Sequence, residues 1–220
     1  MTDRLVVDRP LALDAVVVML SPTKGTLWSH ANLVVAAALL VELTRLGRLT
    51  VTGSQQQLEV AVHDPTPVGD DLLDEALRTV GAADGPIRVT KVITMLPTSD
   101  QVLDRLVAEG AVTEGSDRKF GLFKVQRHRP TPAAGRDALR STVRAAFKGE
   151  TEPDSRSVML FSVVDIGPNL RGGLPSERRP EVARQAYAIR DTIGEGESAL
   201  VSTIDEVVRR ANAAARDSIG

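Results

Sequence analysis

The chain has 220 residues, of which 42% are hydrophobic and 25% are charged, and its formal net charge is −2. This composition is ordinary for a globular protein with a sizeable core, so we expect one domain over residues 1–220. The absence of cysteine excludes disulfides, thiolate metal sites and a cysteine nucleophile.

The sequence has no pattern for metal binding, secretion or membrane crossing. Its three histidines, His30, His63 and His128, show no ligand spacing, so we expect no zinc site and no cofactor. The first 14 residues carry three aspartates and lack the layout of a signal peptide. The longest apolar run, Leu33–Val41, has nine residues, too few to cross a bilayer. We therefore expect a cytoplasmic protein that can associate peripherally with the cytoplasmic face of a membrane.

The first apolar segments predict a central buried helix. Residues 11–20 are apolar and β-branched, which suits either a buried strand or a short helix. A helix is then predicted to run to about Arg45, with Ser29 or Asn32 as its N-cap and Gly47 as its terminator. This helix is apolar nearly all round, so we expect it to lie at the centre of the fold.

Two short strands are predicted over residues 48–63, and an acidic segment, Asp64–Val80, follows them. Asp70 or Asp71 is expected to cap a helix whose first turn holds further acids, where the helix dipole favours them. The alternative is a metal or acid–base site, because Asp71 and Glu75 are four residues apart and could share an ion. Capping is the preferred interpretation, since helix starts commonly carry such acids.

The second half of the chain predicts further helices and one hairpin. Thr98–Asp100 should begin a helix that Gly110 ends, and residues 111–126 should form the hairpin. The remaining predicted elements are a basic helix at 136–148, a linker at 149–156, a buried helix at 157–166, a loose segment at 168–180, and two closing helices at 180–192 and about 198–216.

Basic residues gather between Arg118 and Lys148, where nine Lys or Arg residues stand against one acid, Asp137. Such a concentration attracts anionic partners, for example lipid headgroups, nucleic acid or acidic proteins. In the predicted helix four cations recur every fourth residue, a spacing that stacks them on one face. This basic cluster comprises Arg118, Lys119, Lys124, Arg127, Arg129, Arg136, Arg140, Arg144 and Lys148.

A plainer interpretation of the basic cluster is a solvated helix face beside an ordinary hairpin. Solvated faces usually alternate in sign, however, and this segment holds almost no acids. There is no G-x-G-x-x-G, P-loop or G-x-S-x-G motif, and no arrangement of Ser, His and Asp that suggests nucleophilic catalysis. We therefore expect a protein that is not an enzyme and has no catalytic residues.

Several stretches together resemble the Golgi phosphoprotein three family of sorting-adaptor-like proteins and its bacterial homologues. Leu39–Val51 is similar to the family's central helix and the strand after it. Asp64–Leu77 resembles its most recognisable motif, of the form D-x-P-T-G-D-x-L-L-D-E-A-L. Arg105–Val112 followed by Arg118–Val125 looks like the helix that leads into its projecting hairpin, and Glu152–Ser157 resembles the start of its next helix.

The resemblance implies a mainly α fold, a single helical-bundle domain with a central buried helix and one or two β-hairpins, one of them projecting. It implies a peripheral membrane protein that binds phosphatidylinositol 4-phosphate and links the membrane to cargo as an adaptor. It also implies a homo-oligomer formed through the hairpin at residues 111–126, and no catalytic activity. The identity of any protein partner is left open.

The family's phosphoinositide pocket uses one Trp and three Arg residues. Trp28 falls within one residue of the position of the Trp, whereas Ala36, Leu96 and Ser99 stand at or near the positions of the arginines. The basic cluster offers a replacement, because each cation near an anionic surface adds about 1 kcal/mol of binding free energy. Three apolar residues of the hairpin are candidates for shallow membrane insertion or oligomer contact: Phe120, Leu122 and Phe123.

The leading hypothesis is a non-enzymatic binder of phosphoinositide or other anionic lipid headgroups that uses Trp28 and the basic cluster. The first alternative is a soluble protein–protein interaction module whose basic face docks an acidic partner or another subunit. For Trp28 itself the alternative is a core residue under the central helix, and for the hairpin apolars it is packing against the domain or a second subunit. Nucleic-acid binding is not expected, because aromatic residues make up only 3% of the chain and base stacking needs them.

Overall fold

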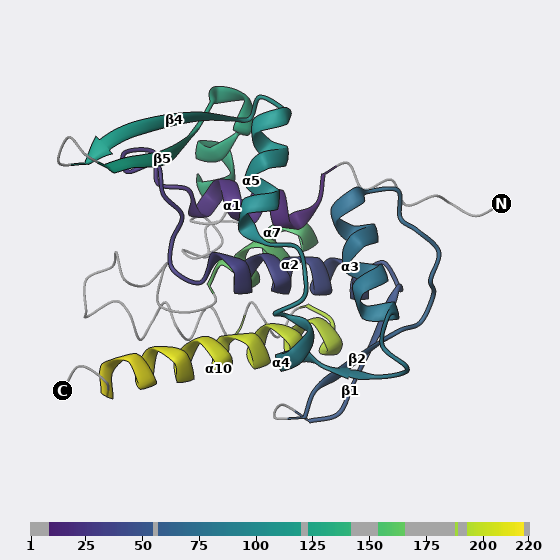
Figure 1. Ribbon diagram of the computed structural model, residues 1–220. Coiled ribbons are helices and arrows are strands. Elements are labelled where there is room, and N and C mark those ends of the chain that lie inside the picture. Colours follow the sequence, from purple (N-terminus) through teal and green to yellow (C-terminus); the bar gives the residue numbers. More distant parts are fainter. Residues whose placement is uncertain are drawn as a thin grey trace.

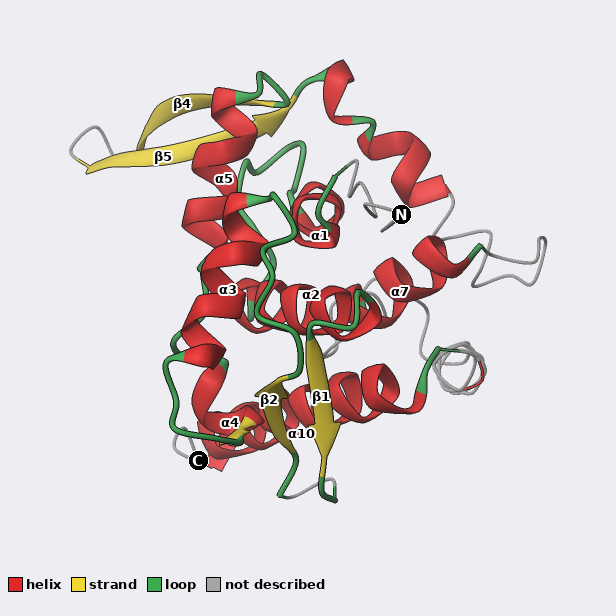
Figure 2. Cartoon of the chain, turned by 90° about the vertical axis from the view of Figure 1, so that its right-hand side faces the viewer, coloured by secondary structure: helices red, strands yellow, loops and turns green. Residues whose placement is uncertain are grey.

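Helix α2 (Ala31–Arg45) is the centre of the computed structural model, and the other elements are arranged around it (Figures 1 and 2). Every residue from Val34 to Leu43 is buried, and all but Glu42 are apolar. The helix ends where Gly47, at a φ of 68°, donates to the Thr44 carbonyl at 3.0 Å. The predicted central helix and its glycine terminator are confirmed.

The structure describes residues 9–54, 57–119, 123–141, 154–165, 188 and 193–217, with only the backbone at 117–119, 123–125 and 211–217. Among these, no helix is both long and apolar enough to cross a bilayer.

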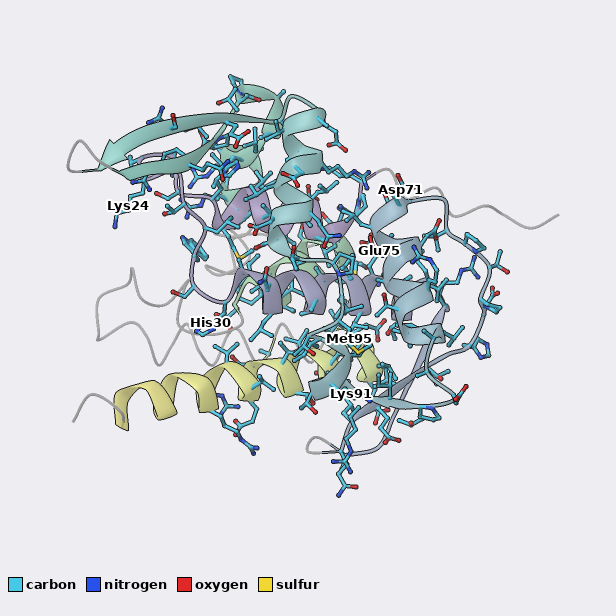
Figure 3. All side chains as sticks on the ribbon, viewed as in Figure 1. Lys24, His30, Asp71, Glu75, Lys91 and Met95 are labelled. Carbon is cyan, nitrogen blue, oxygen red and sulfur yellow. The ribbon has the colours of Figure 1, made fainter. Side chains whose placement is uncertain are left out.

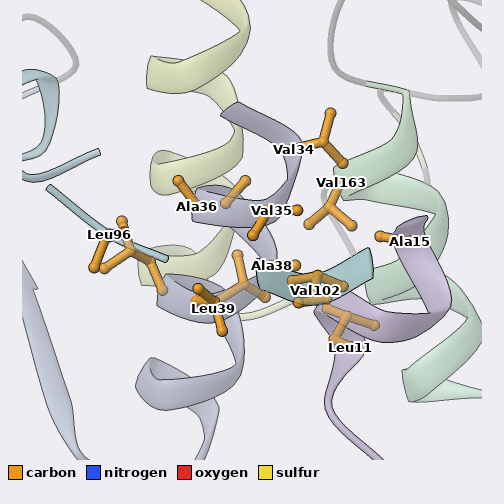
Figure 4. Close-up of a cluster of buried hydrophobic side chains, with 14 of the residues drawn as sticks. Leu11, Ala15, Val34, Val35, Ala36, Ala38, Leu39, Leu96, Val102 and Val163 are labelled. Carbon is orange, nitrogen blue, oxygen red and sulfur yellow. The ribbon is translucent and has the colours of Figure 1, made fainter. Parts of the chain in front are cut away.

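Three helices pack on α2 and enclose the core. They are α1 (Leu11–Met19), α7 (Ser155–Val164) and α10 (Glu195–Asp217), and α1 and α7 also contact each other. In Figure 4, Leu11 of α1 and Val163 of α7 lie in one cluster with Val35 of α2. The sequence left both a strand and a helix open for residues 11–20, and the structure shows a helix. A helix pairs its own backbone groups, so α1 can be buried without a neighbouring strand.

Two further helices, α3 (Asp71–Gly81) and α5 (Ser99–Ala108), also contact α2 and have the caps that the sequence predicts. The Asp70 carboxylate accepts the Leu72 and Leu73 N–H groups at 3.1 and 3.2 Å. Thr98 caps α5 in a reciprocal capping box with Gln101. Gly110, at a φ of 71°, follows the end of α5 as expected.

A small antiparallel sheet lies under the end of α2. It has the order β1 (Leu49–Thr52), β2 (Glu59–Val62), β3 (Ile87–Arg88), and β3 leads directly into the one-turn helix α4 (Val89–Val92). β1 contacts both α2 and α10, so the sheet closes one end of the core. The two strands predicted over residues 48–63 are confirmed.

Strands β4 (Val112–Lys119) and β5 (Phe123–Pro130) form a hairpin that projects from the helical body (Figure 1). Its register runs from the Val112–Pro130 pair at the base to the Lys119–Phe123 pair near the turn. The hairpin therefore extends four residues beyond the predicted end at 126. A short 3₁₀ turn, η1 (Pro132–Ala134), connects it to a helical segment at residues 136–141.

The predicted elements of the later chain are only partly described. Residues 142–148 of the basic helix and the loose segment 168–180 lie outside the described residues, as does nearly all of the helix predicted at 180–192. The predicted boundary of the linker at residue 156 is wrong. Helix α7 already begins at Ser155, because Asp154 accepts the Ser157 N–H at 2.9 Å and caps it. The final helix is confirmed as α10. The fold is mainly α with small antiparallel strand pairs, as predicted.

Candidate functional site

A hollow of about 370 Å³ lies beside Trp28, where the projecting hairpin meets the helical body. Its walls are the loop from α1 to α2, the first turns of α2 and α5, and strand β5. Trp28 is half-buried, packing against the core on one side while lining the hollow. The side chains around the hollow include Trp28, His30, Asn32, Asp100, Gln126 and His128.

The loop that carries Trp28 is folded on itself and docked on the hairpin. Ser21 donates to the Thr26 carbonyl, and Gly25 donates to the Ser21 carbonyl, each at 2.9 Å. The Gly25 carbonyl in turn accepts the His128 N–H of β5 at 3.0 Å. Gly25 has a φ of 61°, at which other residues are strained, and a Cβ there would lie 3.0 Å from the Cβ of Arg127, so this close approach favours glycine. These contacts hold the loop against β5.

The start of α2 at the hollow differs from the prediction. His30 is the N-cap residue, in the left-handed conformation at φ 64°, and its side chain makes no capping hydrogen bond. Neither Ser29 nor Asn32 caps α2 as predicted. Asn32 instead accepts the Ser99 N–H at 2.8 Å and the Ser99 hydroxyl at 2.7 Å with its side-chain oxygen. Among the described residues, the N–H groups of Ala31 and Asn32 have no acceptor.

Among the basic-cluster residues whose side chains the structure describes, Arg140 contacts Trp28. The guanidinium carbon of Arg140 lies 5.5 Å from the centroid of the Trp28 ring, a cation–π distance. Trp28 is therefore neither a sealed core residue nor a freely exposed one. Its ring lies between Arg140, on the helical segment at 136–141, and the hollow.

The hairpin register divides the cations of the basic cluster between two faces. Arg118 pairs with Lys124, and both stand on the face that Gln126 and His128 share, because opposed residues of an antiparallel pair lie on the same face. Lys119, Arg127 and Arg129 belong to the other face. Of the cations whose side chains are described, Arg129 is exposed and Arg127 half-buried. The register therefore assigns cations of the basic cluster to both faces of the hairpin.

Arg136 does not belong to an exposed basic face, which corrects the predicted row of four cations. Its side chain is only 9% exposed, and its Nε donates to the Leu20 carbonyl at the end of α1 at 3.0 Å. Burial lowers the pKa of the Arg136 guanidinium, although the nearby Asp137 carboxylate opposes this effect. Arg136 therefore joins the helical segment at 136–141 to the C-terminus of α1, where the helix dipole favours a cation.

The other predicted site residues lie in the less described part of the chain. Arg144, Lys148, Phe120 and Leu122 are outside the described residues, and Arg118, Lys119, Phe123 and Lys124 are described only by their backbone.

Other residue types stand at the positions where the family resemblance led us to expect arginines. Ala36 and Leu96 are buried in the core and do not reach the hollow. Ser99 lines it but is buried and bonded to Asn32. Sequence reasoning did not select Asn32, Asp100 or His128 as site residues. Only the packing of three distant segments brings these residues together, so no local spacing could have indicated them.

Acidic side chains at the start of α3 stabilise that part of the fold through hydrogen bonds and an ion pair. Asp70 caps α3 and forms an ion pair with Arg105 at 2.6 Å, while Asp74 accepts the Val68 N–H at 2.7 Å. The described residues contain no group of His or acidic side chains arranged to hold a metal ion. Asp71 and Glu75 lie on α3 at the opposite side of the molecule from Lys24 and the hairpin (Figure 3). The capping interpretation is confirmed at Asp70.

These features define a class of protein: a helical domain around one buried helix, with a projecting basic hairpin and an aromatic-lined hollow at its base. The comparison with known families identifies the class further. The family model for Golgi phosphoprotein 3 (GPP34) matches residues 11–215, nearly the whole chain, and the chain therefore belongs to this family. The comparison with curated proteins found no match. Membership fits a lipid-binding adaptor in general terms.

Proposed function

We propose that this chain is a non-enzymatic, peripheral membrane protein that binds phosphoinositide or other anionic phospholipid headgroups. The binding surface comprises the hollow at Trp28 and the cations around it. The observation that carries the proposal is the position of Trp28. It lines a hollow between the hairpin and two helix starts, and Arg140 lies on its ring.

Electrostatics around the hollow favours an anionic ligand. Lys24 is exposed on the loop beside the hollow, and Arg129 is exposed on the other face of β5. Helices α2 and α5 both begin at the hollow, so the positive ends of their dipoles point toward it. At an anionic surface each nearby Lys or Arg contributes about 1 kcal/mol, and salt weakens this contribution.

The hairpin supplies the other parts of the proposal. Phe120, Leu122 and Phe123 follow β4 in the sequence, and we propose that they insert shallowly among the headgroups. Pairing of hairpins between copies of the chain would form a homo-oligomer, and a membrane-bound oligomer can serve as an adaptor for a protein partner.

Vesicle co-sedimentation tests the proposal with two charge-matched double variants. Lys24→Ala/Arg129→Ala removes one exposed cation on the loop beside the hollow and one on the other face of β5. Lys91→Ala/Arg88→Ala removes two exposed cations on the far side of the fold. Binding to phosphatidylserine-doped vesicles should fall roughly thirtyfold in the first variant, because two cations contribute about 2 kcal/mol, and should change little in the second.

Salt and vesicle composition complete this test. Binding should be absent with pure phosphatidylcholine vesicles and should weaken as salt rises. If the wild-type chain binds no anionic vesicle at low salt, or if the two double variants lose binding equally, the proposed surface is wrong. A docking site for an acidic protein would then be the next hypothesis to test.

A further inference from the structure

A buried charge cluster, made of Arg9, Asp14, Glu42 and Arg156, lies where α1 begins. The carboxylates of Asp14 on α1 and Glu42 on α2 are both buried. Arg156, in the first turn of α7, donates to the Arg9 carbonyl and, at 2.7 Å, to the Asp14 carboxylate. Arg9 lies 3.2 Å from the other Asp14 oxygen. The cluster therefore joins the start of α1 to both α2 and α7.

Within this cluster, Glu42 holds the first amide of α1. Its carboxylate accepts the Leu11 N–H at 2.6 Å, and α1 has no side-chain cap from its own segment. The Glu42 side chain is only 7% exposed. A helix N–H that is buried without an acceptor is costly, so the hydrogen bond to Leu11 and the packing of α1 on α2 depend on each other.

The other end of α1 is attached separately. Arg136 donates to the Leu20 carbonyl at 3.0 Å, and the Leu20 N–H bonds the Val16 carbonyl at 2.9 Å. The two ends of α1 are thus held by different residues on different elements. Local opening can therefore free the start of the helix while its end stays in place.

The charges that face Glu42 compensate its carboxylate poorly. Arg156 lies 3.7 Å from its second oxygen, too far for a hydrogen bond, and already bonds Asp14. Asp70 at the start of α3 is paired with Arg105 of α5. Burial, and to a smaller extent Asp70 and Asp14, raises the pKa of Glu42 to about 7, although the bonded amide of α1 and Arg156 act in the opposite direction.

We propose that the start of α1 is a pH-sensitive switch, closed while Glu42 is protonated and opened more readily once Glu42 is ionised. In the closed state the neutral carboxyl accepts the Leu11 N–H inside the core. In the open state the first turn of α1 separates from α2, and water hydrates the ionised carboxylate. This conformational step goes beyond the proposed function, because it requires no lipid and responds to protons alone.

The direction of the response follows from the two pKa values of Glu42. Opening returns the carboxyl to water and to its ordinary pKa of 4.5, so the closed state holds more protons between about pH 4.5 and pH 7. The closed state is favoured at the acidic end of this range and loses that advantage as pH rises. The protection of the Leu11 amide from hydrogen exchange should therefore fall about tenfold from pH 6 to pH 8, after correction for the intrinsic exchange rate.

Native-state hydrogen exchange of the full wild-type chain in dilute urea, followed by NMR, tests whether the opening is local. Leu39, buried in α2, is the reference, because we expect its amide to exchange only through global unfolding. Exchange at Leu11 should depend little on urea, since local opening exposes little surface, whereas exchange at Leu39 should rise steeply. Equal urea dependence at the two amides would overturn the switch.

Two carboxyl-to-amide variants identify the group that titrates. In Glu42→Gln, the protection of Leu11 should no longer change between pH 6 and pH 8. In Asp14→Asn, the midpoint should move to lower pH, because a repelling charge is removed and Arg156 becomes free to pair with Glu42. A purely structural role of Asp14 would alter protection without moving this midpoint.

Thermal melts at pH 6 would check that both variants are folded. The wild-type profile by itself keeps the proposal falsifiable if a variant does not fold. A wild-type protection of Leu11 that is flat from pH 6 to pH 8 overturns the switch. A Glu42→Gln profile that matches the wild type also overturns it, since another group would then be titrating.

Discussion

The Glu42 carboxylate in the last turn of α2 accepts the backbone N–H of Leu11, the first residue of α1, at 2.6 Å. Helix α1 begins after Pro10 without a side-chain cap from its own segment, so Glu42 provides a cap from a distant helix. Arg156 of α7 lies 3.7 Å from the other side-chain oxygen of Glu42. Burial raises the pKa of Glu42 to about 7, although the Leu11 hydrogen bond and Arg156 act in the opposite direction.

This pKa predicts a specific pH dependence of stability. A carboxyl whose folded pKa lies above its unfolded value of 4.5 binds more protons when folded, so the free energy of unfolding falls as pH rises from about 4.5 to about 7. Glu42→Gln keeps an oxygen acceptor for Leu11 and cannot ionise. The variant should therefore be more stable than wild type at pH 8, by an amount that shrinks toward zero near pH 4.5.

Urea unfolding of both proteins between pH 4.5 and pH 8 would measure this difference. Glu75→Gln is the matched control, because Glu75 lies on α3 and is not buried, and its profile should follow that of the wild type. A Glu42→Gln variant that is less stable than wild type at pH 8 would show that ionised Glu42 stabilises the fold through Arg156.

Asp70 and Asp71 are adjacent acids, and we expect them to contribute differently to the free energy of unfolding. Asp70→Ala should lower the free energy of unfolding by about 2 kcal/mol, because it removes the cap of α3 and the ion-pair partner of Arg105. Asp71→Ala should cost less than about 1 kcal/mol, since Asp71 is exposed and acts only through the helix dipole. Chemical denaturation measures both, and equal losses would contradict the capping role.

Substitutions of Arg136 and Arg129 should have different effects, the first on stability and the second on vesicle binding. Arg136→Ala should lower the free energy of unfolding by about 1–2 kcal/mol, because the buried Leu20 carbonyl loses its donor. Arg129→Ala, at an exposed position, should leave stability nearly unchanged and weaken binding to anionic vesicles. Thermal melts and vesicle co-sedimentation on the same samples would compare them. A loss of vesicle binding by a fully folded Arg136→Ala chain would contradict this assignment.

Asn32 should stabilise the contact between α2 and α5. Asn32→Ala leaves the N–H and hydroxyl of the buried Ser99 without their acceptor, so the free energy of unfolding should fall by about 1–3 kcal/mol. Asn32→Asp keeps the acceptor oxygen and should restore most of the loss. Denaturation curves for the two variants would check this order, and an Asp variant as unstable as the Ala variant would refute it.

The elements that sequence patterns predicted correctly are those with a local physical cause. An all-round apolar run predicted α2, Asp70 and Thr98 were recognisable as caps, and Gly47 and Gly110 as terminators. Each of these signals depends on residues within about one helical turn of each other. A single chain segment therefore carries enough information to specify them.

Residues whose partners are distant in the sequence were assigned wrongly. Asn32 is a residue type that often caps helices, and it stands near the start of its own helix. Its side-chain oxygen instead accepts a hydrogen bond from Ser99, 67 residues away. Arg136 fits the four-residue row of cations, yet it is buried against the end of α1. In both cases a contact between segments overrides the local pattern, because a buried polar group must find a partner wherever the fold provides one.

The sequence by itself determined the central helix, the hairpin, the basic cluster and the family resemblance. The reason is that hydrophobic period, capping residues, charge and motifs are properties of contiguous residues. Only the tertiary structure decided which polar side chains meet at Trp28, which cations face solvent and which carboxyl titrates near pH 7. Those properties depend on burial and on distances between separate segments, and these are set when α1, α2, α5 and the hairpin pack together.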